Sequence, residues 1–113
     1  MLREGMKWSK PEKEIARRAF NAAYNRECDS ILQNIRKNAM EAKSPAELWQ
    51  INNYLTEKRK EADEKYDFRY SVIHLVFARL IYEGWMQKED LEGISKDKFQ
   101  EIQKIAEFYA GLR

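Results

Sequence analysis

The sequence has few residues that break helices and few that form cross-links. Its 113 residues include four glycines, two prolines and one cysteine. Pro11 and Pro45 each precede a long stretch without a further proline or glycine, which favours a single all-α domain. Because the lone Cys28 cannot form a disulfide within the chain, we expect a cytoplasmic protein.

The residues of common catalytic and metal sites are also missing. His74 is the only histidine, and no second ligand stands at the spacing of a zinc site, so we expect no metal and no cofactor. The sequence has no nucleophile–base arrangement and no phosphate-binding loop. We therefore expect no catalytic residues, no enzyme activity and no small-molecule substrate.

Charge of one sign and long apolar runs are lacking too. Lys and Arg number 21 against 19 Asp and Glu, for a net charge of +2. This balance gives no electrostatic footprint for nucleic acid. The longest apolar run, residues 72–81, is interrupted by His74 and Arg79 and is too short to span a bilayer.

Ser9 and Glu12 predict where the first long helix begins. Their spacing is that of a capping box, and we expect the helix to run from about residue 10 to about residue 42. Residues 1–8 before it are expected to form a flexible arm. Apolar residues recur along this helix every three or four positions: Ala16, Phe20, Tyr24, Cys28, Ile31, Ile35, Ala39 and Ala42.

A second capping signal, Ser44 to Glu47 with Pro45 at the first helical position, predicts another long helix that reaches about residue 67. Opposite charges stand four apart along it and predict a solvated face. The expected pairs are Arg59 with Asp63, Lys60 with Glu64, and Glu61 with Lys65.

Residues 68–113 are expected to form a smaller C-terminal helical head. Asp67 is a candidate cap for a helix over residues 68–83, although a buried strand would also explain the run VIHLVF. The length of the pattern and the following Gly84 favour helix. A short helical turn at residues 88–92 and a last helix from Ser95 complete the prediction.

The length of the first helix predicts a homodimer. About 33 helical residues span roughly 50 Å, whereas a compact chain of this size is about 35 Å across. The first helix must overhang, and its apolar residues would face water unless a second copy covered them. We expect residues 9–67 to form an elongated twofold homodimer whose interface contains Tyr24, Ile31, Ile35, Leu48, Ile51 and Leu55.

The run from Leu48 to Gly84 is the most distinctive part of the chain. Its characteristic residues are Leu48, Trp49, Leu55, Lys58, Arg59, Glu61, Asp63, Lys65, Tyr66, Asp67, Arg69, Ser71, Val72, Ile73, Val76, Phe77, Ala78, Leu80, Glu83 and Gly84. This pattern resembles the fluorescence recovery protein family of cyanobacteria. The resemblance continues upstream to Trp8 and fades downstream towards Ala106.

The resemblance implies a small, dimeric, all-helical accessory protein without catalytic chemistry. Family members bind the photoactivated orange carotenoid protein, chiefly through that protein's C-terminal domain. They speed its return to the orange form and help to detach it from the phycobilisome, which ends non-photochemical quenching. If the source is cyanobacterial, the resemblance also allows a position peripheral to thylakoid membranes.

By the same resemblance, the partner-binding residues are Trp49, Asn52, Asn53 and Arg59. The family carries a His-Asp pair where this chain has Asn52 and Asn53, so an ionic contact becomes a neutral hydrogen bond. A phenylalanine usual in the family is Leu75 here. Arg59 is open to a second interpretation as the partner of Asp63, Trp49 as a packed side chain, and the two asparagines as solvated amides.

Two other functions stay open at this point. One is a helical dimer that serves a different partner, motivated by the Asn52–Asn53 pair. The other is a nucleic-acid-binding dimer, motivated by a small basic cluster at Lys10, Lys13, Arg17 and Arg18. A steep salt dependence of binding would indicate the latter.

Overall fold

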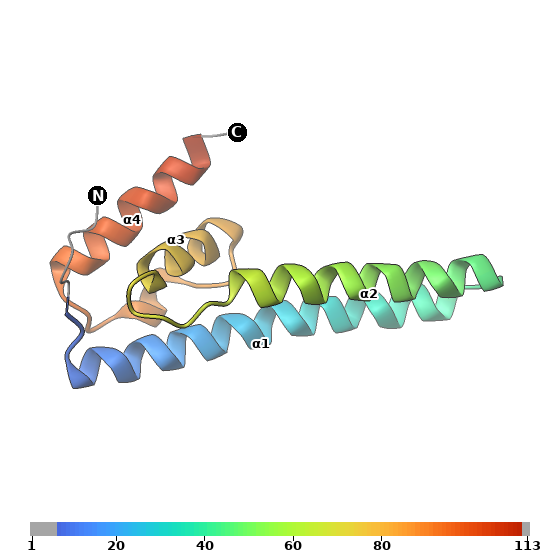
Figure 1. Cartoon of the computed structure of the whole chain (residues 1–113), viewed down its shortest axis with the longest axis horizontal. Coiled ribbons are helices and arrows are strands. Elements are labelled where there is room, and N and C mark those ends of the chain that lie inside the picture. The colour runs from blue at the N-terminus through green and yellow to red at the C-terminus, as the bar shows by residue number, and fades with distance from the viewer. Residues whose placement is uncertain (1–6, 112–113) are drawn as a thin grey trace.

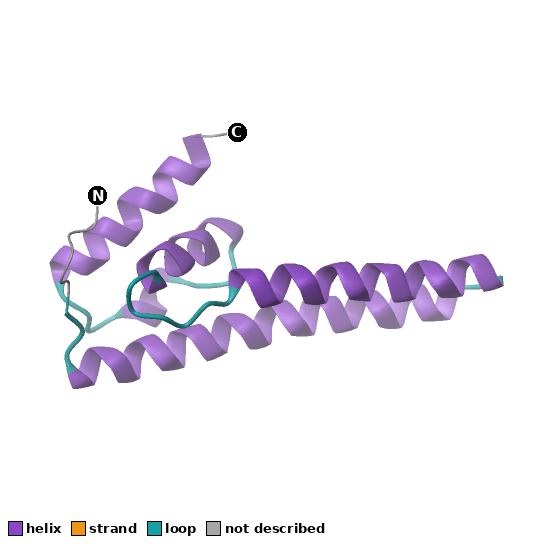
Figure 2. Cartoon of the chain, in the orientation of Figure 1, coloured by secondary structure: helices purple, strands orange, loops and turns teal. Residues whose placement is uncertain are grey.

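The computed structural model describes residues 7–111, which form an all-α fold. The elements are α1 (Lys10–Glu41), α2 (Pro45–Lys65), α3 (Ile73–Glu83), the 3-10 helix η1 (Lys88–Leu91) and α4 (Lys96–Gly111). Helices joined by loops account for the whole described chain (Figure 2). The alternative of a strand at VIHLVF is therefore wrong, and helix is confirmed.

The molecule is elongated because α1 and α2 form a hairpin that extends well beyond the rest of the chain. They run side by side in opposite directions, while α3, η1 and α4 gather at the open end of the hairpin to form the head (Figure 1). The principal extents are 53 × 30 × 21 Å and the radius of gyration is 16.8 Å. A compact chain of this length would have a radius near ~13 Å. The predicted overhang of the first helix is confirmed.

Local signals set the starts of both long helices. The Ser9 hydroxyl accepts a hydrogen bond from the Glu12 amide at 3.3 Å, and the Glu12 carboxylate accepts one from the Ser9 amide at 2.9 Å. This is the predicted capping box. At α2 the Ser44 hydroxyl accepts from the Glu47 amide at 3.2 Å, but the Glu47 carboxylate accepts from the Lys43 amide instead of closing a box on Ser44.

The third helix begins later than predicted. It starts at Ile73 without a side-chain cap, rather than at residue 68 with Asp67 as its cap. The Asp67 carboxylate instead accepts a hydrogen bond from the Arg69 guanidinium at 2.8 Å. Phe68 packs edge-on against Phe20 of α1, with 4.9 Å between ring centroids. This contact and the Asp67–Arg69 pair hold the segment as a loop across α1.

The hydrophobic core lies in the head and under the first half of α1. Its buried apolar residues are Trp8, Ala16, Ala19, Phe20, Ala23, Ile73, Val76, Phe77, Ala78, Leu80, Met86, Leu91, Ile102 and Ala106. Trp8 is 7% exposed and meets Phe77 edge-on, so the end of the expected flexible arm is part of the core. Residues 1–6 of that arm lie outside the described residues.

Glu12 joins the start of α1 to the start of α4. Its carboxylate accepts hydrogen bonds from the Ser95 amide at 2.7 Å and from the Lys98 ammonium at 3.1 Å. Burial disfavours the ionised carboxylate, but these contacts and the Ser9 amide outweigh that effect and lower the pKa of Glu12 to about 2. The capping residue of α1 is therefore also a tertiary contact of the head.

The rest of the hairpin has no interior of its own. From residue 28 to residue 64, no side chain of α1 or α2 is buried. The two helices meet through partly exposed contacts, such as the hydrogen bond from the Asn34 amide to the Tyr54 hydroxyl at 2.9 Å. A helix pair in water is held mainly by burial of apolar side chains, so this half of the hairpin is held together less firmly than the head.

Candidate protein-interaction site

The four predicted partner-binding residues all lie on the exposed side of α2. Trp49 is 62% exposed, and both Asn52 and Asn53 are exposed. The Arg59 side chain is 82% exposed. At about 100° per residue, the four positions occupy roughly a third of the helix circumference, with Asn52 and Arg59 almost in line. The helix therefore brings them onto one continuous surface.

Arg59 forms the ion pair that the sequence predicted, but the pair is weak. Its guanidinium lies 3.6 Å from the Asp63 carboxylate, and both side chains are more than half exposed. An exposed pair of this kind contributes little to stability, so Arg59 can exchange Asp63 for another carboxylate at small cost. The interpretation of Arg59 as a partner of Asp63 is confirmed, and it is compatible with a role in binding.

Trp49 is largely uncovered by the described residues 7–111. With 62% of its surface exposed, near the turn that joins α1 to α2, it is available to a second molecule. Large aromatic side chains are favoured anchors of protein interfaces because they bury much apolar area at low entropic cost. Trp49 packs against none of the described residues closely enough to be buried, and its packing across a dimer stays a prediction.

An uncovered apolar strip lies beside these polar positions. Leu48 is 53% exposed and Leu55 is 47% exposed on α2, while Tyr24 on α1 is 42% exposed. Ile31, Ile35 and Ile51 are half-buried. All six residues predicted for the dimer interface thus retain accessible apolar surface in the single chain. Leu48 and Leu55 lie close to Asn52 and Arg59 around the helix, which joins the strip to the polar row.

The other predicted charge pairs do not form on this surface. No ion pair joins Lys60 to Glu64 among the described residues, and Glu61 pairs with Lys58 at 3.5 Å. Lys65, the expected partner of Glu61, has a side chain only 4% exposed and turns inward. The last turn of α2 therefore departs from the solvated face that the spacing of charges predicted.

Lys65 is the centre of a buried charge cluster that sequence reasoning missed. Its ammonium lies 2.8 Å from the Glu27 carboxylate of α1 and 2.7 Å from the Glu83 carboxylate of α3. The Tyr66 hydroxyl donates to Glu27 at 2.8 Å, and Arg79 donates to Glu83 at 2.8 Å. Of these contacts, the one between Lys65 and Glu83 connects the hairpin to the head. No local spacing signals the pairing of Lys65 with Glu27 and Glu83, which are 38 and 18 residues away.

Electrostatics in this cluster follow from burial and hydrogen bonding. Burial raises the pKa of the Tyr66 hydroxyl, and the neighbouring Glu27 carboxylate raises it further. For Glu83, burial favours the neutral form, but hydrogen bonds from Lys65 and Arg79 outweigh it and hold the pKa below its usual range. Glu83 therefore stays ionised at neutral pH.

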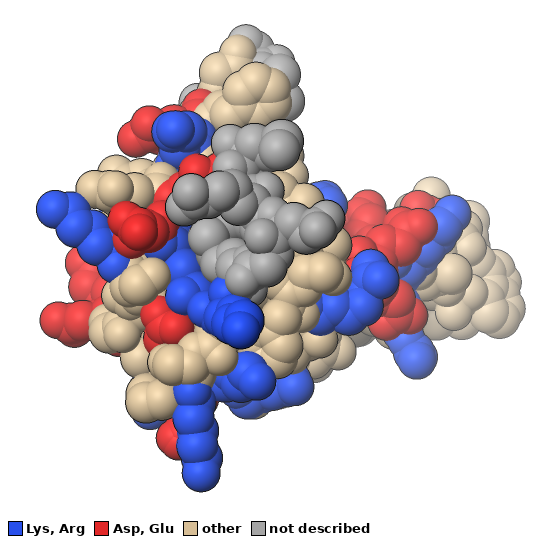
Figure 3. Space-filling view, turned by 60° about the vertical axis from the view of Figure 1, so that its left-hand side comes forward, with Lys and Arg blue, Asp and Glu red and all other residues tan. Residues whose placement is uncertain are grey.

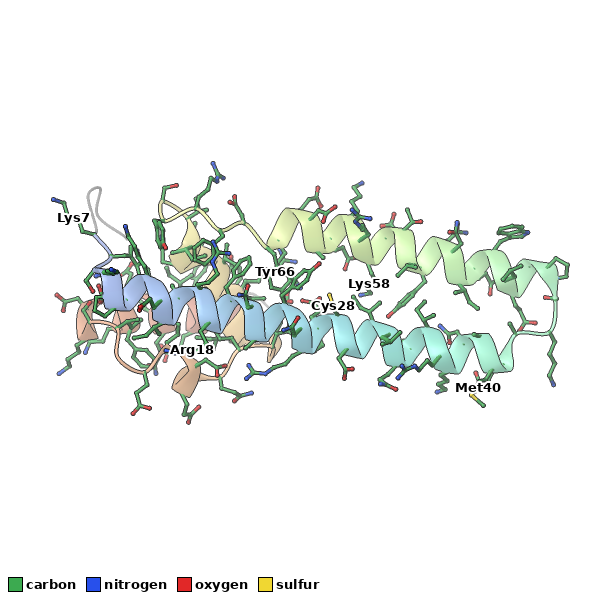
Figure 4. All side chains as sticks on the ribbon, turned by 90° about the horizontal axis from the view of Figure 1, so that it is seen from below. Lys7, Arg18, Cys28, Met40, Lys58 and Tyr66 are labelled. Carbon is green, nitrogen blue, oxygen red and sulfur yellow. The ribbon has the colours of Figure 1, made fainter. Side chains whose placement is uncertain are left out.

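The cluster connects to the uncovered strip through Tyr24. The Tyr24 and Tyr66 rings meet edge-on with 5.0 Å between their centroids. A hydrogen bond with the Cys28 thiol raises the pKa of the Tyr24 hydroxyl. Cys28 and Tyr66 project from α1 and from the end of α2 into the space between the two helices (Figure 4).

Residues 7–111 contain no cluster of three or more His, Cys, Asp or Glu side chains placed to hold a metal ion. Within the same residues, each helix is too short or too polar to cross a membrane. What the α2 surface offers is an aromatic anchor, a guanidinium, two amides and adjoining apolar area, which is the composition of a protein-binding surface.

Comparisons with known proteins agree with this picture. The family model described as photoprotection regulator fluorescence recovery protein matches residues 8–106. The fluorescence recovery protein of Synechocystis sp. is 39% identical over 99 residues, which cover 88% of this chain and 91% of that protein.

Solved structures of the family share the fold. That of the Fremyella diplosiphon fluorescence recovery protein has a TM-score of 0.85 and 40% identity, and the match covers 89% of this chain and 99% of that one. The Synechocystis structure gives a TM-score of 0.85 and 39% identity with the same coverage. The resemblance that begins in the Leu48–Gly84 run thus extends over most of the chain, which belongs to the fluorescence recovery protein family of photoprotection regulators.

Proposed function

We propose that this protein binds the photoactivated form of an orange carotenoid protein, chiefly at that protein's C-terminal domain, and accelerates its return to the inactive orange form. The observation that carries the proposal is the exposed row of Trp49, Asn52 and Arg59 on α2. Family membership supports the choice of this partner, and the row is the surface that we propose binds it. The proposed setting is the cytoplasm, at the thylakoid surface where phycobilisomes would lie.

The proposed action needs no bond chemistry and no cofactor. A regulator that binds the photoactivated form, and binds the conformations on the way back to the orange form more tightly still, lowers the barrier to the return. Trp49 would anchor the partner, and Arg59 would exchange Asp63 for a partner carboxylate. Asn52 and Asn53 would contribute neutral hydrogen bonds, which are weaker than contacts of a charged His-Asp pair.

We further propose that the working form is a homodimer. The supporting observation is that Tyr24, Leu48 and Leu55 are each more than 40% exposed in the single chain. A twofold pairing of hairpins would cover them together with the half-buried isoleucines. Sedimentation should show a dimer for the natural protein and a monomer for the double variant Leu48→Glu, Leu55→Glu. The matched variant Gln50→Glu, on another side of α2, should stay dimeric.

The activity is tested by mixing the protein with photoactivated orange carotenoid protein and following recovery of the orange absorption in the dark. Faster recovery is the expected result, and Arg59→Ala should slow it while Lys60→Ala, one residue along, should not. Absence of both binding and acceleration at micromolar excess, with the dimer intact, would refute the proposal.

A second candidate function keeps the dimer and changes the partner. It is favoured by one observation, namely the uncharged Asn52 and Asn53 exposed in the middle of the row. The double variant Asn52→His, Asn53→Asp separates the two candidates. If the natural chain is inactive and the variant accelerates recovery, the surface is intact but serves a different partner.

A further inference from the structure

The outer face of α1 carries a basic groove that the proposed function does not use. This groove is shallow and wide open to solvent, and it is lined by Lys10, Lys13, Glu14, Arg17, Arg18, Asn21, Ala22 and Asn25. At about 100° per residue these positions lie opposite the buried face of α1, which contains Ala16, Ala19 and Ala23. Nothing in residues 7–111 covers this groove.

The positive charge of the groove is not neutralised within the described chain. Its lining holds four cationic residues against the single carboxylate of Glu14, a surplus larger than the net charge of +2 of the whole sequence. None of the ion pairs within residues 7–111 involves Lys10, Lys13, Arg17 or Arg18. Figure 3 shows Lys and Arg side chains gathered along the lower part of the molecule, where α1 begins in Figure 1.

Two of the cations are held in place by aromatic rings. The Arg17 guanidinium stacks over the Phe68 ring at 3.6 Å from its centroid, and the Lys13 ammonium lies 5.2 Å from the Tyr70 centroid. Such contacts restrict long side chains without neutralising their charge. Phe68 and Tyr70 of the loop before α3 thus restrict two of the cationic side chains of the groove. This restriction lowers the entropic cost of binding an anion there.

The Glu14 carboxylate and the uncharged residues of the groove decide which class of anionic partner it fits best: nucleic acid, membrane or protein. Glu14 lies inside it and would repel a continuous phosphate backbone, and four cations are few for the many phosphate contacts on which nucleic-acid affinity depends. A membrane surface would require an apolar side chain to insert, and the uncharged lining residues are Asn21, Ala22 and Asn25. Discrete carboxylates can pair with the cations and avoid Glu14.

We propose that this groove binds an acidic helical segment of a partner protein. Lys10 to Arg18 spans about 12 Å, which matches carboxylates spaced at i, i+4 and i+7 on one face of a helix. Asn21 and Asn25 extend the groove with neutral hydrogen-bonding groups. The surface is separate from the α2 row, since Asn34 pairs with Tyr54 and thus sets Arg59 beside the middle of α1, beyond the groove. The proposal does not rest on the carotenoid-protein activity.

The test measures binding of a fluorescently labelled helical peptide of about 16 residues with three glutamates on one face, by anisotropy at low salt with the full chain. Binding should be tighter than for the same peptide with glutamines, and should weaken as salt increases. The triple variant Lys10→Glu, Lys13→Glu, Arg18→Glu should bind the peptide about tenfold more weakly, since three exposed charge pairs are lost.

A matched variant separates local charge from total charge. Lys37→Glu, Lys96→Glu, Lys104→Glu makes the same change in net charge at exposed positions outside the groove, and should keep most of the affinity. The proposal is overturned if the glutamate and glutamine peptides bind alike, or if both triple variants lose affinity equally. Tighter binding of a single-stranded oligonucleotide or of vesicles containing anionic lipid would also overturn it.

Discussion

Replacement of Lys65 by methionine should be the most informative single change to the fold. Lys65 is 4% exposed and its ammonium bridges Glu27 and Glu83 at 2.8 and 2.7 Å. Methionine fills a similar volume but leaves two poorly solvated carboxylates facing each other across the junction of hairpin and head. The fold stays complete, so the change isolates the charge.

The size of the effect follows from what remains around each carboxylate. Breaking a buried ion pair by removal of one partner costs about 3–5 kcal/mol. Arg79 still donates to Glu83, and Tyr66 still donates to Glu27, so we expect the lower end of that range. A loss of about 3 kcal/mol would lower the midpoint of thermal unfolding by roughly 12 °C in a domain of this size.

The loss should depend on pH with a definite sign. The pKa of Glu83 is held below its usual range by Lys65 and Arg79, so the stability it contributes is complete above the unfolded pKa. That contribution fades as pH falls through the folded pKa. The gap in stability between the natural protein and Lys65→Met should therefore be widest near neutral pH and should narrow on acidification.

Urea unfolding followed by circular dichroism, at fixed protein concentration and several pH values, measures both effects. Lys60→Met is the control, because Lys60 is exposed on the same helix and makes no ion pair in the described chain. Adding Glu27→Gln to Lys65→Met should restore part of the stability. The reasoning fails if Lys65→Met matches the control, or if its deficit grows in acid.

Two further changes test other parts of the head. Glu12→Gln should lower the free energy of unfolding by about 3 kcal/mol at neutral pH, because the pKa of Glu12 drops from 4.5 to about 2 on folding. The difference in stability between this variant and the natural protein should disappear as the pH falls from 4.5 to about 2. Gly93→Ala should lower the free energy of unfolding by about the 1–2 kcal/mol of a left-handed backbone, because its new Cβ, 2.7 Å from Ile15 Cδ1, meets only the movable end of a side chain. Gly84→Ala, also at positive φ but in open space, should lower it by about the same amount, and a much larger loss at Gly93 would contradict this reasoning.

Local chemistry made the long helices predictable. Ser9 with Glu12, and Ser44 with Glu47, placed the starts of α1 and α2 correctly because a cap is decided by residues three apart. The same reasoning misplaced α3, since whether Asp67 caps a helix depends on competition from Arg69, which no periodicity reveals.

The candidate site divides in the same way. Helical spacing was enough to place Asn52 and Arg59 almost in line on α2, and the Arg59–Asp63 pair formed as expected. Lys65 shows the limit of that method, because its two partners come from α1 and α3 and its burial is set by tertiary packing. The groove on α1 was predictable in part. Its cations form a cluster in the sequence, but their contacts with Phe68 and Tyr70 depend on how the loop packs across α1.

The hairpin between residues 28 and 64 contains no buried side chain, which has a consequence for measurement. Backbone amides exchange with deuterated solvent through local opening, and opening is easy where little apolar area holds the helices together. In dilute separate chains this half should exchange quickly while the head stays protected. Where another molecule binds the hairpin, exchange should slow only at the amides that it covers. Hydrogen exchange could therefore map the binding surface before the bound molecule is identified.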